Sequence, residues 1–252
     1  MSIAQPKTKL SEVLDQLRPY ATNRQRIDQL TAARMRRELD KNAASDYHLY
    51  YTVRGMLAVT EWNEVAADEN FTKALKISDD FITNTHYATA LQLLGKHQEA
   101  CFYASRASAL APTDLAALRK TESYAYVAGE FELGIESSRS LKLRAPGKPT
   151  MLEEAMENVI ASLHALGVED DMVKKCNSLA FTFLREKQVP FASTQYISDG
   201  MDNSVMFSIL LYPEQANWAE LDGELGELLF DHVPGFHPGK YWVGLESGKD
   251  EA

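Results

Sequence analysis

Acidic and imidazole side chains gather near the end of this sequence, and they are the residues best suited to chemistry. They are Asp199, Asp202, Asp231, His232 and His237. Carboxylates and imidazoles together can bind a divalent metal or exchange protons. Their spacing matches no motif with a mechanical basis, and Asp199 and Asp202 also suit a turn. A metal-assisted hydrolase in this region is therefore an alternative that the sequence leaves open, without an assigned catalytic residue or metal ligand.

Other motifs that carry chemistry are missing from the sequence. The 252 residues contain no phosphate-binding glycine loop, zinc-finger spacing or serine elbow. Cys101 and Cys176 lie 75 residues apart in helical contexts, which favours buried, reduced thiols over a disulfide or a metal pair. We therefore predict a non-enzymatic protein that requires no cofactor.

The charge of the chain is acidic overall but unevenly distributed. The net charge is −10, yet residues 1–46 carry nine basic and six acidic residues, whereas residues 189–252 carry two and eleven. The acidic part argues against a nucleic-acid surface and suits either a basic protein partner or a solvated surface. There is no run of 18 apolar residues, and the start, MSIAQPKTKL, lacks the apolar segment of a secretory signal. These features predict a cytoplasmic protein that does not enter a membrane.

Two segments in the middle of the chain align when they are shifted by 34 residues. The shift places Gly95 on Gly129 and Pro112 on Pro146. A period of helix, short turn, helix and proline is typical of a helical solenoid, in which each repeat buries its apolar face against its neighbours. Glycine ends the first helix of each unit because it adopts a left-handed conformation without strain.

The same reasoning places elements along the whole chain. Two single helices are expected at 11–18 and 23–41, followed by helix pairs over 48–77, 81–112, 115–146 and 150–187. The last pair suits a capping unit of the solenoid. From Pro190 the apolar period changes from helical to two-fold. Strands are expected at 190–198, at 205–212, where both faces are apolar, and at 240–246, with a helix that starts at Pro213 and has Trp218 facing inward.

The helix expected at 23–41 has a basic face. Its arginines are Arg24, Arg26, Arg34, Arg36 and Arg37. One interpretation is a contact with an anion or an acidic partner. The other is a solvated helix whose arginines pair with Asp28, Glu38 and Asp40.

The repeated units resemble the tetratricopeptide repeat (TPR) family. That family's motif has a bulky, a small and an aromatic residue on the first helix, then Ala, an aromatic and Ala on the second, and a following Pro. The matching residues are Tyr51, Gly55, Ala67, Phe71 and Ala74 in the first unit, Ala88, Leu91, Ala100, Ala107 and Pro112 in the second, and Ala125, Gly134, Leu141 and Pro146 in the third. Glu122 departs from the pattern, because a small residue is expected there. The resemblance covers about 100 residues and implies small residues that let paired helices approach closely.

The resemblance also implies a concave groove lined by residues of each first helix that are not needed for packing. By register these include Thr52 and Met56, and the predicted partner-binding set is Thr85, Thr89, Gln92, Arg119, Ser123 and Tyr126. Some family members hold a terminal carboxylate with paired Lys and Asn at such positions. Hydroxyls and one arginine stand there in this chain, which suits an extended peptide or a helix instead.

These observations together predict a mainly α protein, a TPR-like helical-repeat solenoid with a small C-terminal α+β domain of ββαβ order. Its expected segments are a helical arm (1–46), the repeats with a capping pair (47–188) and the α+β domain (189–252). The predicted function is a cytoplasmic adaptor that holds a segment of a protein partner and acts as a subunit of a larger complex. A bacterial secretion-type chaperone for a hydrophobic client is the alternative within the binding class.

Overall fold

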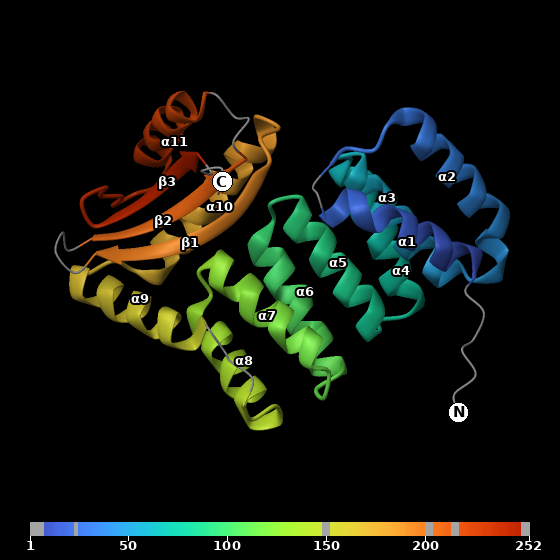
Figure 1. Cartoon of the computed structure of the whole chain (residues 1–252), viewed down its shortest axis with the longest axis horizontal. Helices are drawn as coiled ribbons and strands as arrows, with labels where there is room; N and C mark the ends of the chain where they lie inside the picture. Colours follow the sequence, from blue (N-terminus) through green and yellow to red (C-terminus); the bar gives the residue numbers. More distant parts are fainter. Residues whose placement is uncertain (1–7, 23–24, 148–151, 200–203, 213–216, 248–252) are drawn as a thin grey trace. The chain divides into compact units, whose positions relative to one another are not determined.

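The computed structural model describes residues 8–22, 25–147, 152–199, 204–212 and 217–247, and this part of the chain is mainly helical with a small sheet (Figure 1). The chain divides into two compact units. The N-terminal unit comprises residues 1–94 and 102–111, and the C-terminal unit comprises residues 95–101 and 112–252. Helix α6 (His97–Leu110) therefore contributes residues to both units.

The N-terminal unit is built from helices that follow one another at short intervals. They are α1 (Lys9–Thr22), α2 (Gln29–Asn42), the 3-10 turn η1 (Ala43–Ser45), α3 (Tyr47–Thr60), α4 (Glu64–Ile77) and α5 (Phe81–Leu93). The side chains of Asp28, Asp46, Asn63 and Asp80 accept hydrogen bonds from backbone N–H groups in the first turns of α2, α3, α4 and α5. These caps satisfy donors that the start of a helix leaves unpaired, so the sequence fixes the helix starts locally.

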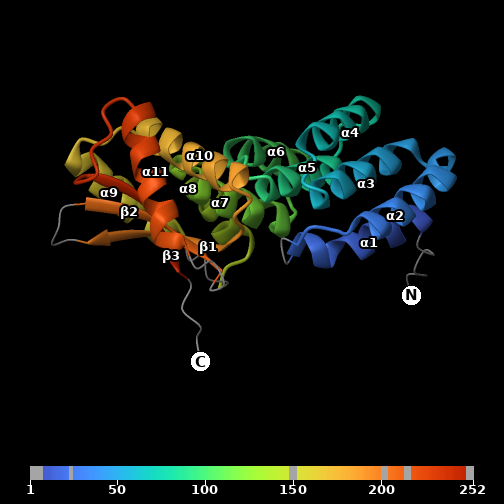
Figure 2. The same ribbon diagram turned by 90° about the horizontal axis from the view of Figure 1, so that it is seen from above.

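The two N-terminal helices differ from the prediction. We expected the first helix to end before Pro19, which is wrong, because α1 continues to Thr22. Pro19 lies in the last turn, where its missing N–H removes only the bond to the carbonyl of Asp15, four residues earlier. The second helix starts at Gln29 and not at residue 23, because Asp28 is extended and accepts a 2.9 Å bond from Thr31 N as the N-cap. Helices α1 and α2 lie side by side (Figures 1 and 2).

Close packing of α3 against α4 depends on a glycine. A Cβ atom at Gly55 would lie 2.6 Å from the ring atom Cε2 of Phe71, which is fully buried. Glycine at this position therefore lets the aromatic ring sit against the backbone of α3. The expectation that a small residue permits this approach is confirmed here.

The C-terminal unit holds the remaining elements. They are α7 (Leu115–Ala128), α8 (Phe131–Arg144), α9 (Leu152–Leu166), α10 (Asp170–Glu186), β1 (Phe191–Asp199), β2 (Ser204–Leu211), α11 (Trp218–His232) and β3 (Tyr241–Ser247). The ββαβ order is confirmed. The expected helix start at Pro213 lies outside the described residues. The inward position of Trp218 is wrong: its side chain stays exposed at the first residue of α11, whereas Leu221, Leu225 and Leu229 form the buried stripe.

The sheet has the order β1-β2-β3, with β1 antiparallel to β2 and β3 parallel to it (Figures 1 and 2). The predicted burial of the 205–212 strand follows from this order, since β2 is central. Its residues Val205, Phe207 and Ile209 belong to one apolar core that also contains residues of α8, α9, α10 and α11. The sheet thus packs on the helix pair expected to cap the repeats. The boundary between the two compact units does not coincide with those of the three predicted segments. The repeat architecture stays a prediction.

A buried polar network joins α10 to the sheet. Asn177 Nδ2 donates to the hydroxyl of Tyr196 on β1 at 2.6 Å and to the carbonyl of Val127 at 3.2 Å. The hydroxyl of Tyr241 on β3 donates to Asn177 Oδ1 at 2.6 Å. Burial raises the pKa of both phenols above its ordinary value. A single amide therefore satisfies polar groups from α7, β1 and β3 inside the core.

Candidate functional site

Several helices end in one recurring turn. A residue one or two positions after the helix has a positive φ in each case, at Trp62 (61°), Gly95 (75°), Gly129 (78°), Gly167 (65°) and Gln188 (58°). In four of these turns the next N–H reaches back to the carbonyl five residues earlier at 2.9 Å, as from Asn63 N to Ala58 O. This pattern is the Schellman motif, which satisfies the last carbonyls of a helix. The predicted helix-ending roles of Gly95 and Gly129 are confirmed.

Trp62 is the unexpected residue at this position. The left-handed region crowds Cβ against the backbone and costs roughly 1–2 kcal/mol for a residue other than glycine. A bulky side chain with positive φ is a true outlier, and such outliers concentrate where a protein binds or reacts. A glycine would close the α3–α4 turn with less strain. The tryptophan is thus retained against the local preference of the backbone.

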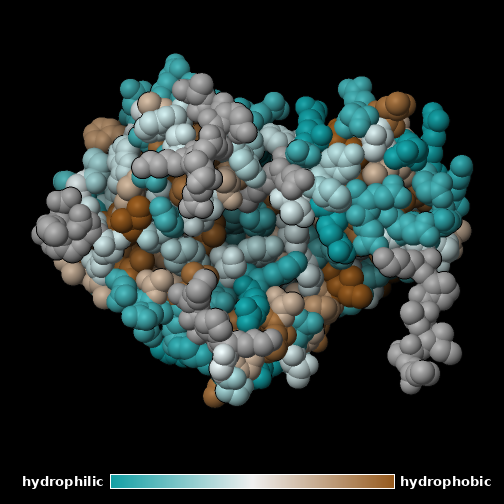
Figure 3. Space-filling model, in the orientation of Figure 1, coloured by the Kyte–Doolittle hydropathy of each residue, from teal (hydrophilic) through white to brown (hydrophobic). Residues whose placement is uncertain are grey.

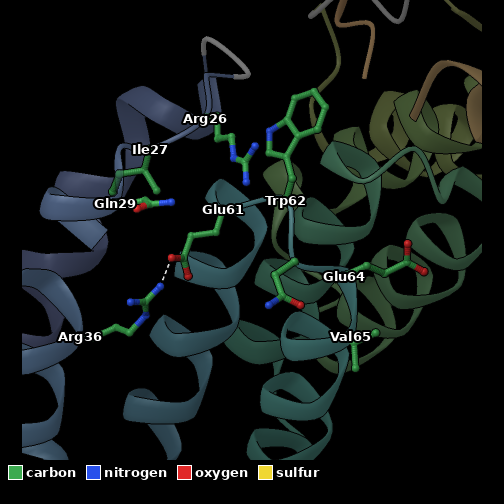
Figure 4. A pocket seen from close by; sticks show the side chains of 9 residues that line it. Arg26, Ile27, Gln29, Arg36, Glu61, Trp62, Glu64 and Val65 are labelled. Carbon is green, nitrogen blue, oxygen red and sulfur yellow. Dashed lines mark hydrogen bonds and ion pairs between the residues drawn. The ribbon is translucent and has the colours of Figure 1, made fainter. Parts of the chain in front are cut away.

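The Trp62 turn lines a pocket of about 760 Å³ at the surface of the N-terminal unit (Figure 4). Its lining residues are Arg26, Ile27, Gln29, Arg36, Glu61, Trp62, Asn63, Glu64 and Val65. We call this the Trp62 pocket. Two interactions hold its walls together: Ile27 N donates to Thr60 O at 3.0 Å, and Arg36 forms an ion pair with Glu61. The segment before α2 is thereby fixed to the end of α3.

Only some of the polar groups in the Trp62 pocket are already engaged. Arg36 is occupied by Glu61. Arg26 and Gln29 are exposed, and within the described part of the chain neither side chain makes a hydrogen bond or an ion pair. Figure 4 shows Arg26 beside Trp62, above the Arg36–Glu61 pair. An exposed guanidinium therefore lies next to the indole, and the amide of Gln29 lines the same pocket.

This combination suits an anionic group with an apolar neighbour. A guanidinium binds carboxylate or phosphate oxygens through two parallel hydrogen bonds. The indole supplies a flat apolar surface and one N–H donor. Trp and Arg are also the residues most enriched among those that dominate the binding energy of protein interfaces.

The predicted partner-binding residues are divided between the two units. Thr85, Thr89 and Gln92 lie on α5 in the N-terminal unit, and Arg119, Ser123 and Tyr126 lie on α7 in the C-terminal unit. The hydroxyls of Thr85 and Thr89 donate to carbonyls one turn earlier, at 2.8 and 2.9 Å. A groove shared by the six residues stays a prediction.

Other predicted groove positions serve packing. Thr52 and Met56 are buried, so the expectation that they contact a ligand is wrong. The hydroxyl of Tyr126 accepts a 2.9 Å bond from Tyr196 N, and the two rings are 5.0 Å apart, edge to face. Arg119 and Ser123 are exposed on α7. Tyr126 thus anchors α7 to β1.

The acid–imidazole residues do not form a metal site within the described residues. No three His, Cys, Asp or Glu side chains of that part are placed to hold an ion. His237 Nδ1 accepts a bond from Gly239 N at 3.1 Å, and His232 Nδ1 lies 3.0 Å from Leu228 O. Asp202 lies outside the described residues. Cys101 and Cys176 are both buried free thiols, and burial raises the pKa of each to about 12.

The sequence carries one signal for the Trp62 pocket, which the repeat register alone does not predict. A shift of 33 residues aligns the first helix pair with the second and places Trp62 on Gly95. A tryptophan in the register of a helix-ending glycine marks a strained turn. The approach of Arg26 depends on the 25–28 segment leaving the helix, which the sequence did not predict.

The chain matches no protein-family model, no curated protein and no solved structure. Among the helices of the described ranges, none has the length and apolar character needed to cross a membrane.

Proposed function

We propose that the protein is a non-enzymatic adaptor with TPR-like helical repeats, and that the Trp62 pocket holds a segment of its protein partner. The segment carries an acidic residue beside an apolar one. The acidic group binds the guanidinium of Arg26, and the apolar neighbour lies on the indole of Trp62.

The observation that carries this proposal is the left-handed conformation of Trp62 beside the exposed guanidinium of Arg26. Folding alone favours glycine in this turn, so an indole held there beside an exposed guanidinium supports a role in binding. The paired helices with glycine-ended turns support the repeat interpretation. A peptide-binding pocket needs no catalytic group, and the lining residues provide hydrogen bonds, charge and an aromatic surface.

A selection of displayed random peptides against the full chain tests the proposal. Enriched sequences should pair Asp or Glu with an apolar or aromatic residue. Synthetic copies with a fluorescent label should lose at least about tenfold in affinity for Trp62→Gly and for Arg26→Glu, measured by fluorescence anisotropy.

Gln188→Gly is the matched control. Gln188 has the same positive φ at the end of α10, so this substitution relieves a similar strain outside the pocket. Peptide affinity should be unchanged. Selected peptides without acidic residues, or equal binding by Trp62→Gly and the wild type, would refute the assignment.

A further inference from the structure

The exposed side of α2 carries a basic stripe. Leu30, Arg34, Arg37 and Lys41 recur at intervals of four, three and four residues and lie on one side of the helix. All four are exposed, and Leu30 is 81% accessible. Within the described residues, none of the three cations has a partner. In the view of Figure 3 the surface over α2 is mainly hydrophilic.

The acidic residues that were expected to neutralise this face are engaged elsewhere. Asp28 caps α2 through Thr31 N, at 2.9 Å. Glu38 accepts a bond from Asn42, and Asp40 accepts one from the hydroxyl of Tyr50 and pairs with Arg54. Among the described residues none of these acids pairs with an arginine of α2, so the pairing interpretation is wrong there, and Arg24 lies outside the described residues. The basic stripe keeps its charge for another molecule.

Helix α11 carries an acidic stripe with the same spacing. Glu220, Glu224, Glu227 and Asp231 recur at intervals of four, three and four residues. Three of them are exposed without a partner in the described residues, and Glu224 pairs with Lys187. Next to Asp231 at the end of the helix, Phe230 is 70% exposed.

The two stripes are complementary when the helices run antiparallel. That arrangement places Arg34 opposite Glu227 and Lys41 opposite Glu220. It also brings Leu30 to the end of α11 that carries Phe230, whereas a parallel arrangement separates these two apolar residues. Antiparallel helices also align their dipoles favourably. Exposed ion pairs bind weakly and are screened by salt, so the contact should depend strongly on ionic strength.

We propose that α2 of one copy of this protein binds α11 of a second copy, antiparallel, through these two stripes. The occupant is a second copy because a single chain presents both surfaces, with equal spacing and opposite charge. This contact is independent of the Trp62 pocket, whose lining contains none of the stripe residues.

Sedimentation velocity of the full chain, over a concentration series at about 50 mM and about 500 mM NaCl, tests the proposal. The wild type should self-associate, and its dissociation constant should rise at least about tenfold at the higher salt. A variant with Arg34→Glu and Lys41→Glu, and a variant with Glu220→Lys and Glu227→Lys, should each stay monomeric. Their equimolar mixture should associate, because each variant then meets a stripe of opposite charge.

Lys76→Glu with Lys175→Glu makes the same change in net charge as Arg34→Glu with Lys41→Glu, but at exposed positions outside the stripes, and it should associate like the wild type. A wild-type chain that stays monomeric at low salt overturns the proposal, even if α2 binds another acidic protein or a nucleic acid. A mixture of the two variants that fails to associate overturns it as well.

Discussion

The turn at Trp62 and the turn at Gly129 close their helices with the same hydrogen bond. Asn63 N donates to Ala58 O, and Glu130 N donates to Ala125 O, each at 2.9 Å. The surroundings differ. Gly129 is buried under α10, where an added Cβ would lie 3.2 Å from Val173 Cγ1, whereas Trp62 is partly exposed in a pocket.

Glycine can be favoured in such a turn for two reasons, the left-handed backbone conformation and a lack of space for a side chain. At Gly129 both the backbone conformation and the lack of space require it. At residue 62 only the backbone conformation favours it, and a tryptophan stands there despite the strain. The covered turn thus serves the fold, and we propose that the open turn serves binding.

The largest loss of stability is expected for Gly129→Trp, which places a tryptophan in the turn that α10 covers. Gly129→Trp combines left-handed strain with overpacking against α10 and should lower the free energy of unfolding by about 4 kcal/mol or more. Urea denaturation measures the loss. Gly167→Ala is the control, because that turn has positive φ but open space, so only about 1 kcal/mol should be lost. Equal losses for both would contradict a role for space at Gly129.

The second-largest loss of stability is expected at Asn177, a residue of α10 that lies over the Gly129 turn. Asn177→Ala removes the partner of Val127 O and of two buried phenols, which should lower the free energy of unfolding by about 3 kcal/mol. Thermal and urea unfolding measure it. Asn63→Ala is the comparison at the open turn, where only the cap on Ala66 N is lost and the cost should be about 1 kcal/mol. An Asn177 variant as stable as the Asn63 variant would contradict the account of the covered turn.

Alkaline pH should lower the free energy of unfolding through the same buried network of Asn177, Tyr196 and Tyr241. Burial raises the pKa of Tyr196 and Tyr241, so the unfolded chain releases these protons near pH 10 while the folded chain keeps them. Below about pH 10 the two phenols make their full contribution to the free energy of unfolding. Between about pH 10 and about pH 11 the free energy of unfolding should fall by about 2 kcal/mol because of the pair. Tyr241→Phe removes one phenol and should lose about 1 kcal/mol less over that interval. An unchanged pH dependence in this variant would exclude the phenol as its source.

The smallest effect isolates the strain at the open turn. Trp62→Gly and Trp62→Ala both remove the indole, but only glycine relieves the left-handed conformation. The glycine variant should therefore be about 1 kcal/mol more stable than the alanine variant, by urea denaturation. Equal stability of the two variants would show that the turn at residue 62 is not strained.

Local signals explain how much of the fold the sequence predicts. The bounds of α4 and of the last helix pairs follow from capping residues, apolar stripes and glycines that act within a few residues of themselves. The continuation of α1 to Thr22 has no such local signal, because Pro19 marks a helix end in the sequence although three more helical residues follow it. The division into compact units likewise depends on contacts between α10 and the sheet, which no local pattern contains.

The candidate site was less predictable for a related reason. Register alone placed Tyr126 and Met56 in a groove, but the core uses both for packing. The Trp62 pocket joins the loop before α2 to the end of α3 through Ile27 N and through Arg36, contacts between segments far apart in the sequence. Only the tryptophan in a glycine register could have pointed to it.

One measurement tests the central claim directly: the affinity for a selected acidic peptide and the free energy of unfolding, determined side by side for the wild type, Trp62→Gly and Gln188→Gly. We expect Trp62→Gly to lose at least about tenfold in affinity while its stability is kept or raised by up to about 1 kcal/mol. Gln188→Gly should show the same change in the free energy of unfolding as Trp62→Gly, and its affinity for the peptide should equal that of the wild type. A Trp62→Gly variant that binds like the wild type, or that loses stability in proportion to binding, would contradict the claim that Trp62 is held in a strained turn for binding.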